Sequence, residues 1–143
     1  MPTLERAIEI AASAHAGQFD KAGQPYILHP LKVMLRVNGA HEQMVAVLHD
    51  VVEDTAVTLD ALRAEGFPDA VLSAIDALTK RPGETRMQAA ARAALNPVAL
   101  AVKLADNAEN MDLSRIPHPT EKDVARLREY EEVRVFLRGC QST

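Results

Sequence analysis

The chain has 143 residues, a length that suits one domain with a hydrophobic core of its own. Its formal net charge of −4 and the lack of a basic stripe argue against nucleic acid as a partner. The single cysteine, Cys140, cannot form an internal disulfide, and no apolar run approaches the length of a membrane span. We therefore expect a cytoplasmic protein without a membrane partner, in which an anionic ligand meets a local cluster of Lys and Arg. The sequence does not indicate an oligomeric state.

Apolar residues recur at three- and four-residue spacing along most of the chain, which is typical of helices with one buried face. His15 lies on such a stripe, where a hydrogen-bonded core histidine is more common than a metal ligand. No alternating run of strand length is present, so the sequence predicts an all-α fold. The predicted helices cover residues 3–16, 30–37, 41–55, 59–65, 68–78, 84–95 and 98–111, and a last helix begins at the capping box of Thr120 and Asp123 and ends at Gly139.

Two of these predictions concern particular side chains. Pro30 suits the first position of a helix, which would place His29 near the N-cap. The helix over 84–95 is rich in alanine, and we expect its Arg86 and Arg92 to be exposed.

The stretch from Val45 to Thr55 combines aliphatic residues with four ionisable ones. In a continuous helix, His49 would share a face with Glu53, four residues on, and Asp50 would share one with Asp54. Buried charges are paired or bound to metal, so a divalent cation beside a phosphate-bearing substrate would balance this set. The alternative is a solvated helix end without a functional role.

Other rigid positions supply matching groups. His29 precedes an amphipathic run, and Asp106 and Asn110 lie four apart in the helix over 98–111. Two imidazoles and two carboxylates suit Mn²⁺, Fe²⁺ or Zn²⁺ better than Ca²⁺ or Mg²⁺. The candidate ligands are His29, His49, Asp50 and Asp106.

Two further groups would complete a hydrolytic site. Glu53 and Asp54 lie one turn beyond the ligands, where they would orient a metal-bound water or act as general base. Lys21 lies in a loop between two glycines, a setting that suits contact with phosphate, although an ordinary surface loop has the same composition.

Four ordered motifs carry a family resemblance: A-H-x-G-Q at 14–18, K-x-G-x-P-Y-I-x-H-P at 21–30, L-H-D-V-V-E-D-T at 48–55 and K-L-A-D-x-x-x-N-M at 103–111. Together they resemble the HD-superfamily hydrolase domain of the RelA/SpoT homologue family, which removes the 3′-diphosphate of ppGpp and pppGpp with Mn²⁺. The resemblance extends from about Thr3 to at least Asp112. It implies a compact multi-helix HD-domain bundle over 1–143 and a stand-alone small alarmone hydrolase, similar in layout to metazoan SpoT homologues.

The resemblance also implies a role for each motif residue. His29, His49, Asp50 and Asp106 would be the metal ligands, and Glu53 and Asp54 the pair that activates water. Lys21 would contact phosphate and Asn110 the nucleotide, while Tyr26 would serve packing more than chemistry.

The departures from the family pattern concern the substrate. The family commonly has R-K-S where this chain has Asp20-Lys21-Ala22, and R-x-H-N-M-R-T where it has residues 107–113, with Asn107, Glu109, Asp112 and Leu113 as the altered positions. We therefore expect Mn²⁺-dependent hydrolysis of a small phosphorylated nucleotide, with the alarmones as the leading substrates. A different phosphorylated nucleotide is one alternative, and a non-catalytic nucleotide sensor is another.

Overall fold

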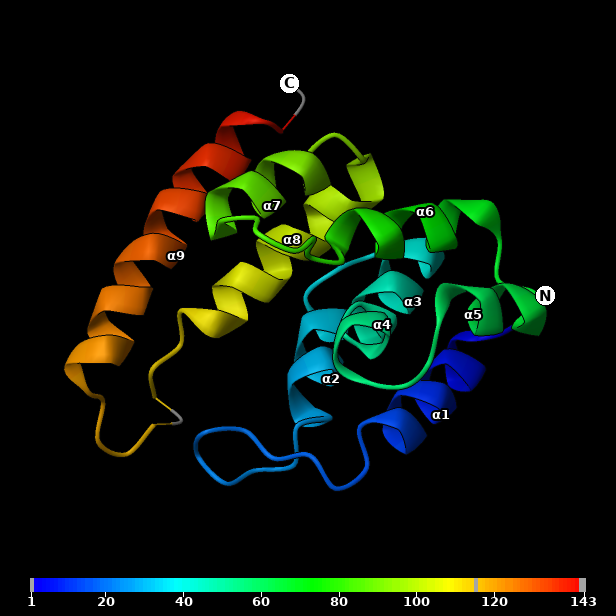
Figure 1. Ribbon diagram of the computed structural model, residues 1–143, viewed down its shortest axis with the longest axis horizontal. Coiled ribbons are helices and arrows are strands. Elements are labelled where there is room, and N and C mark those ends of the chain that lie inside the picture. The colour runs from blue at the N-terminus through cyan, green and yellow to red at the C-terminus, as the bar shows by residue number, and fades with distance from the viewer. Residues whose placement is uncertain (1, 115, 142–143) are drawn as a thin grey trace.

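The computed structural model describes residues 2–114 and 116–141, and these residues form nine α-helices and no β-strand (Figure 1). The predicted all-α fold is confirmed. An isolated antiparallel bridge joins Phe19 to Pro25 and pinches the loop between the first two helices. The helices are α1 (Leu4–Ala14), α2 (Leu28–Leu35), α3 (Ala40–Leu48), α4 (Val51–Asp54), α5 (Leu59–Glu65), α6 (Asp69–Leu78), α7 (Arg86–Ala93), α8 (Pro97–Asn110) and α9 (Glu121–Gly139).

Helix α3 is the centre of the molecule. Its last five residues, Met44 to Leu48, are all apolar, and none is more than 4% exposed. A helix that is apolar on every side must be covered on every side, and α1, α2, α6 and α8 pack around this one (Figure 1). His49, which follows Leu48, therefore lies in the interior.

Helix α9 packs against α7 and α8 and closes a smaller core of Ala90, Val133 and Leu137. The predicted capping box begins it: Thr120 accepts from the amide of Asp123, and the Asp123 carboxylate accepts from the amide of Thr120. At 19 residues α9 is longer than the other described helices, but it is highly charged. Within 2–114 and 116–141, no helix combines the length and the apolar character that crossing a membrane requires.

Two predicted helix boundaries near the candidate ligands were wrong. Helix α2 begins at Leu28 rather than Pro30, because the amides of Leu28 and His29 already bond to the carbonyls of Pro25 and Tyr26. His29 is thus inside the first helical turn. The predicted helix over 41–55 is broken at His49 and Asp50 into α3 and α4.

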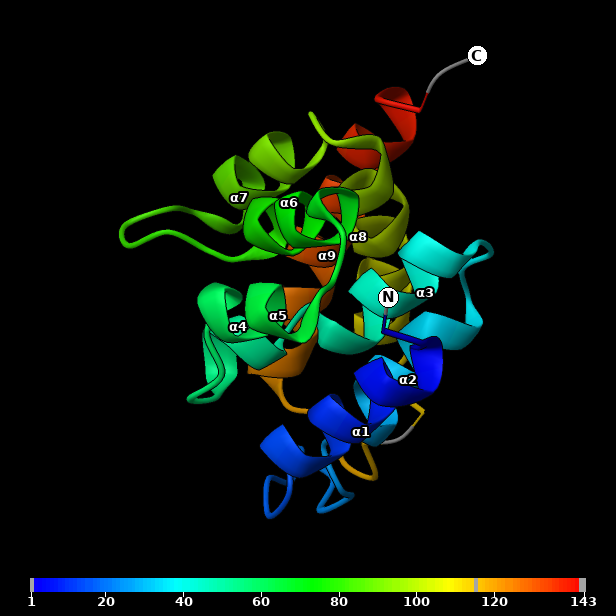
Figure 2. The same ribbon diagram turned by 90° about the vertical axis from the view of Figure 1, so that its right-hand side faces the viewer.

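The connection between α6 and α7 extends away from the helices in Figure 2 and is tied down by Arg92. The guanidinium of Arg92 donates to the carbonyls of Ala77 and Thr79 at 2.8 Å and pairs with Glu84 at 2.9 Å. The expectation that Arg92 is exposed was wrong, because the end of α6 leaves carbonyls that need donors. Arg86 lies over the Tyr130 ring and keeps 39% of its side chain exposed.

Candidate metal and nucleotide site

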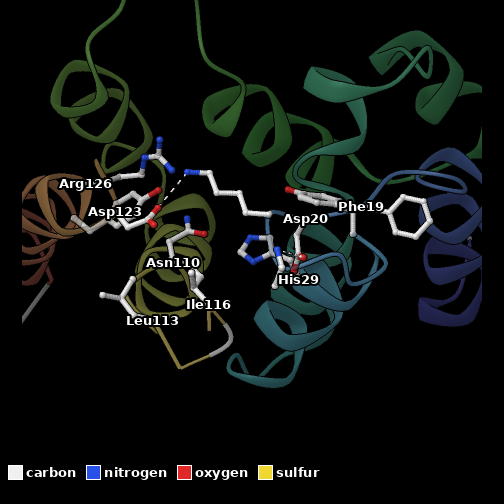
Figure 3. Close-up of a pocket in the computed structure, with 12 residues that line it drawn as sticks. Phe19, Asp20, His29, Asn110, Leu113, Ile116, Asp123 and Arg126 are labelled. Carbon is white, nitrogen blue, oxygen red and sulfur yellow. Dashed lines mark hydrogen bonds and ion pairs between the residues drawn. The ribbon is translucent and has the colours of Figure 1, made fainter. Parts of the chain in front are cut away.

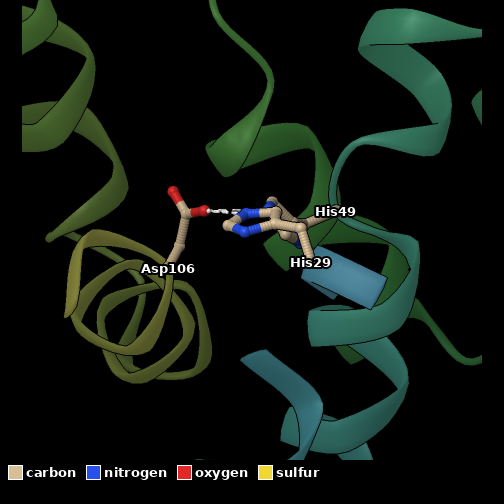
Figure 4. A group of neighbouring side chains, drawn as sticks. All are labelled: His29, His49 and Asp106. Carbon is tan, nitrogen blue, oxygen red and sulfur yellow. Dashed lines mark hydrogen bonds and ion pairs between the residues drawn. The ribbon is translucent and has the colours of Figure 1, made fainter. Parts of the chain in front are cut away.

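Three of the four predicted metal ligands converge in the interior. His29 of α2, His49 at the end of α3 and Asp106 of α8 have ligand atoms within 4.8 Å of one another (Figure 4). The Nε2 atoms of His29 and His49 lie 2.8 and 3.4 Å from Oδ1 of Asp106. All three side chains are buried. The packing of α2 and α8 around α3 is therefore what builds this group.

The orientation of His49 explains both the break in the helix and its suitability as a ligand. Its Nδ1 lies 2.5 Å from the carbonyl of Ala46, the group that would accept from the Asp50 amide in a continuous helix. With Nδ1 donating there, Nε2 is the atom that faces the carboxylates. This Nε2 is fully buried and lies within ion-pair distance of Asp50 and Asp106, but in the described part of the chain no group meets it with hydrogen-bond geometry. A metal ion bound to His49 would satisfy it.

Asp50, the fourth predicted ligand, borders the group of three. Its Oδ2 lies 3.2 Å from Nε2 of His49 and accepts a hydrogen bond from the hydroxyl of Tyr26. Tyr26 therefore contacts a candidate ligand instead of serving packing alone. The sequence offered one indication of this contact. Tyr26 lies three residues before His29, and both belong to the turn that leads into α2.

Opposite charges balance one another inside this group. Burial opposes the charged form of His49, but Asp50 and Asp106 outweigh that effect and hold the pKa of His49 well above its ordinary value. Burial likewise opposes the charge on Asp106, yet Lys103, 3.5 Å away, and the two histidines hold the pKa of Asp106 well below the usual range. The interior thus contains ionised carboxylates, which is the form that binds a cation.

The predicted catalytic pair lies on the single turn of α4. Glu53 and Asp54 are both exposed, but the surrounding protein removes part of their hydration. This partial burial, followed by the neighbouring Asp54 and Asp50 carboxylates, raises the pKa of Glu53. Partial burial and then Asp50 raise the pKa of Asp54. A carboxylate with a raised pKa is a stronger base, as general-base catalysis near neutral pH requires.

The two predicted substrate contacts, Lys21 and Asn110, line one cavity of about 290 Å³ (Figure 3). His29 also lines it, so the cavity opens beside the metal group. Nδ2 of Asn110 lies 3.4 Å from Oδ1 of Asp106. Glu53 instead lines a second cavity, of about 540 Å³, together with Lys80, Arg86 and Lys103.

Helix α9 contributes three cavity residues that sequence reasoning missed: Asp123, Arg126 and Tyr130. Oδ1 of Asp123 forms an ion pair with Nζ of Lys21 at 3.4 Å, and Arg126 lies beside them (Figure 3). The sequence predicts only a helix-capping role for Asp123. The pairing joins residues 102 apart in the chain, and no local pattern reveals such a contact.

Several departures from the family pattern have local structural roles. Oδ1 of Asp20 accepts from the amides of Ala22 and Gln24, so it shapes the loop that carries Lys21. Asn107 is buried and donates to the Tyr130 carbonyl, which fastens α8 to α9. Glu109 pairs with Arg36 at 2.8 Å. Asp112 accepts from the Ser114 amide, and Leu113 lines the cavity of Lys21.

Known proteins resemble this chain in sequence and in fold. The RelA bifunctional (p)ppGpp synthase/hydrolase of Mycobacterium tuberculosis is 38% identical over 91% of this chain and 19% of its own length. A guanosine-3′,5′-bis(diphosphate) 3′-pyrophosphohydrolase of Aquifex aeolicus is 32% identical over 76% of this chain and 17% of its own. The resemblance to the RelA/SpoT homologue family is confirmed. No family model matches the sequence.

The chain spans less than a fifth of the length of these RelA/SpoT relatives. A solved structure described as a metazoan ortholog of SpoT that hydrolyzes ppGpp superposes with a TM-score of 0.80 at 24% identity. The match covers 99% of this chain and 90% of that one. It confirms the predicted compact multi-helix fold.

Proposed function

We propose that this chain is a metal-dependent 3′-pyrophosphohydrolase of ppGpp and pppGpp, and that residues 1–143 are one HD-type domain. The observation that carries the proposal is the buried group of His29, His49 and Asp106, whose ligand atoms all lie within 4.8 Å of one another. Asp106 also contacts Asn110 of one cavity and Lys103 of the other. His29 lines the first of these cavities, so the group adjoins the space that a ligand would occupy.

In this proposal His29, His49, Asp50 and Asp106 would hold Mn²⁺, with Fe²⁺ or Zn²⁺ as other metals that suit the donors. A bound divalent metal would lower the pKa of a water molecule and so supply hydroxide near neutral pH. Tyr26 would keep the Asp50 carboxylate in place through its hydroxyl. Lys103 would balance the charge of Asp106 on the side away from the histidines.

Glu53 and Asp54 would accept the proton of the attacking water. The attack forms a bond between the water oxygen and the phosphorus attached to the ribose 3′ oxygen, and it breaks the bond between that phosphorus and O3′. The proton taken from water then passes to the leaving O3′. The products are pyrophosphate and GDP, or GTP from pppGpp, so atoms and charge balance.

Recognition would rest on the cavity beside the metal group. Lys21 and Arg126 supply positive charge, Asn110 an amide, and Phe19 and Tyr130 aromatic rings. Such a lining suits a small phosphorylated nucleotide, with phosphate on the cations and the base on apolar surface. The molecule as a whole carries a net charge of −4, so these local cations would provide the attraction.

Two observations favour a second candidate, the same chemistry on a different phosphorylated nucleotide. The cavity sets the carboxylate of Asp123 against Lys21, and the family's threonine at the end of its R-x-H-N-M-R-T motif is Leu113 here. Both features weaken contacts to a highly charged nucleotide.

A panel of nucleotides incubated with Mn²⁺-loaded protein tests the proposal. We expect pyrophosphate together with GDP from ppGpp, resolved by chromatography. Turnover of another nucleotide in preference to both alarmones would replace the first candidate with the second. Binding without any turnover, unchanged by Glu53→Gln, would point to a non-catalytic sensor.

A further inference from the structure

Two residues of the A-H-x-G-Q motif have no role in the proposed chemistry but connect directly to the helix that carries Glu53 and Asp54. Nδ1 of His15 lies 2.8 Å from Oε1 of Gln18, and Nε2 of Gln18 donates to the Asp54 carbonyl at 3.2 Å. Because the Gln18 amide donates through Nε2, its Oε1 must accept. The proton of a neutral His15 ring is therefore on Nδ1.

The other nitrogen of His15 indicates that packing alone does not account for this residue. His15 is 2% exposed, and its Nε2 is buried with no hydrogen-bond partner in the described ranges. A buried acceptor without a donor destabilises a fold, whereas a purely apolar ring in the same place would not. The His15 ring also packs on the Tyr26 ring, 5.0 Å between centroids, and the Tyr26 hydroxyl donates to Asp50.

The recipient of the Gln18 bond is a weak element. Helix α4 has only four residues, and a single helical turn is unstable without tertiary support. Its terminal carbonyls have no partner within the helix. Gln18 supplies one to Asp54, while Tyr26 fixes Asp50, the residue just before α4.

We propose that His15 and Gln18 are positioning residues that hold α4, and with it the Glu53–Asp54 pair, in register with the metal group. This inference rests on the proposed hydrolase function. His15 orients Gln18, and Gln18 anchors the end of α4. The His15 ring also supports Tyr26, whose hydroxyl donates to Asp50, the residue just before α4. Neither residue touches the reacting atoms.

The main test is Gln18→Met, which keeps the length of the side chain and removes both hydrogen bonds. We expect kcat to fall by about 10- to 100-fold, since small misplacements of catalytic groups cost that much. KM and the Mn²⁺ bound per chain should stay at wild-type values, and Tm should fall by no more than about 4–8 °C, the cost of roughly 1 kcal/mol of lost hydrogen bonding. The matched control is Gln43→Met, which also gives up a side-chain bond to a backbone carbonyl, that of Val37, in the connection between α2 and α3.

Substitutions of His15 separate positioning from stability. His15→Phe keeps an aromatic ring beside Tyr26 and removes the unpaired nitrogen, so we expect an unchanged or higher Tm with a lower kcat. His15→Asn retains a side-chain N–H near the place of Nδ1 and should recover much of the lost kcat. A wild-type kcat in Gln18→Met would overturn the inference. So would a fall in kcat that is matched by losses of Tm and bound Mn²⁺.

A readout that does not depend on turnover separates this inference from the proposed function. Amide hydrogen exchange of residues 51–55 should be faster in Gln18→Met than in Gln43→Met, because α4 has lost its anchor. If the wild type hydrolyses no nucleotide, the proposed function fails, and faster exchange would still support the anchor. Equal exchange in the two variants would contradict the proposal that Gln18 anchors α4.

Discussion

At the scale of single residues, a proton and a metal ion compete for Nε2 of His49. One ring nitrogen is committed to the Ala46 carbonyl, so any bound cation must share Nε2. Without a metal, the carboxylates of Asp50 and Asp106 raise the pKa of His49 and favour a proton there. With a metal, the same carboxylates become ligands, and the proton must leave.

We expect His29→Gln to abolish stoichiometric Mn²⁺ binding, because it removes an imidazole from the buried group while adding no charge. The control is His41→Gln, which changes a histidine of α3 outside that group and should bind like wild type. Metal content after gel filtration, measured by mass spectrometry, is the readout. Wild-type Mn²⁺ content in His29→Gln would contradict the ligand assignment.

We expect Glu53→Gln and Asp54→Asn each to lower kcat by about 10²–10⁴-fold, the usual cost of losing a general base, with Mn²⁺ content unchanged. The raised pKa of both carboxyls also has a consequence for stability. A raised carboxyl pKa means that ionisation in the folded state is unfavourable, a penalty present at neutral pH and relieved below the unfolded-state pKa.

Replacing Glu53 or Asp54 by its neutral amide should therefore raise the Tm of the metal-free protein at pH 7. At pH 3, where the carboxyls are already protonated, the Tm should be unchanged. Thermal unfolding of chelator-treated wild type, Glu53→Gln and Asp54→Asn at both pH values measures this. A variant that loses kcat and Tm together at pH 7 would indicate damage to α4 rather than loss of a base.

At the scale of elements, an ion pair between Lys21 and Asp123 joins the loop over 17–24 to α9. Asp123 serves two purposes there, since Oδ2 caps α9 and Oδ1 pairs with Lys21. An incoming phosphate would meet a Lys21 whose charge is already partly offset by Asp123. Asp20, on the same loop, is already engaged with the backbone of Ala22 and Gln24.

We expect Asp123→Asn to lower KM for ppGpp several-fold, because the amide oxygen still caps Thr120 while the charge competing for Lys21 is gone. Asp20→Asn should change KM less, because that carboxylate shapes the loop. Steady-state kinetics at two ionic strengths separate a specific contact from a screened surface effect. A larger change in KM for Asp20→Asn than for Asp123→Asn would reverse this assignment.

Sequence patterns correctly predicted those helix ends that are fixed by residues close to them in the chain. Helix α5 ends where predicted because Gly66 adopts φ +95°, and α9 begins where predicted because Thr120 and Asp123 cap each other. The break after Leu48 was not predictable from periodicity, because it depends on the direction of the His49 ring. The pairing of Lys21 with Asp123 requires the whole fold to bring its partners together.

The same contrast applies to the candidate site. Motifs identified His29, His49 and Asp106, which the packing around α3 brings together. They gave no role to Lys103 or Arg126, because a cation in a sequence is most often a solvated surface residue. Only the folded arrangement separates those two from the other Lys and Arg residues.

At the scale of the whole molecule, the metal should reverse the pH dependence of stability between about pH 6 and 8, the range around the ordinary histidine pKa. In the metal-free protein the raised pKa of His49 contributes stability below the unfolded-state pKa, and this contribution is lost as pH rises through the folded-state pKa. In the loaded protein, acidification instead displaces the metal.

We therefore expect Tm of the metal-free protein to rise from pH 8 to pH 6, and Tm of the Mn²⁺-loaded protein to fall. At pH 8, Mn²⁺ at about a hundred times its dissociation constant should add about 2.7 kcal/mol to the free energy of unfolding. Calorimetric scans with and without chelator provide the comparison. Parallel pH profiles in the two forms would contradict the role given to His49.

The spread of the metal group along the chain has a kinetic consequence. His29 and Asp106 are 77 residues apart and meet only when α2 and α8 both lie against α3. An ion held between them therefore finds its complete set of donors only after the folding barrier has been crossed. Its binding energy adds to the barrier for unfolding and leaves the rate of folding nearly unchanged. The loaded protein would persist because it opens slowly, and its lifetime would be set by how often α2 and α8 separate.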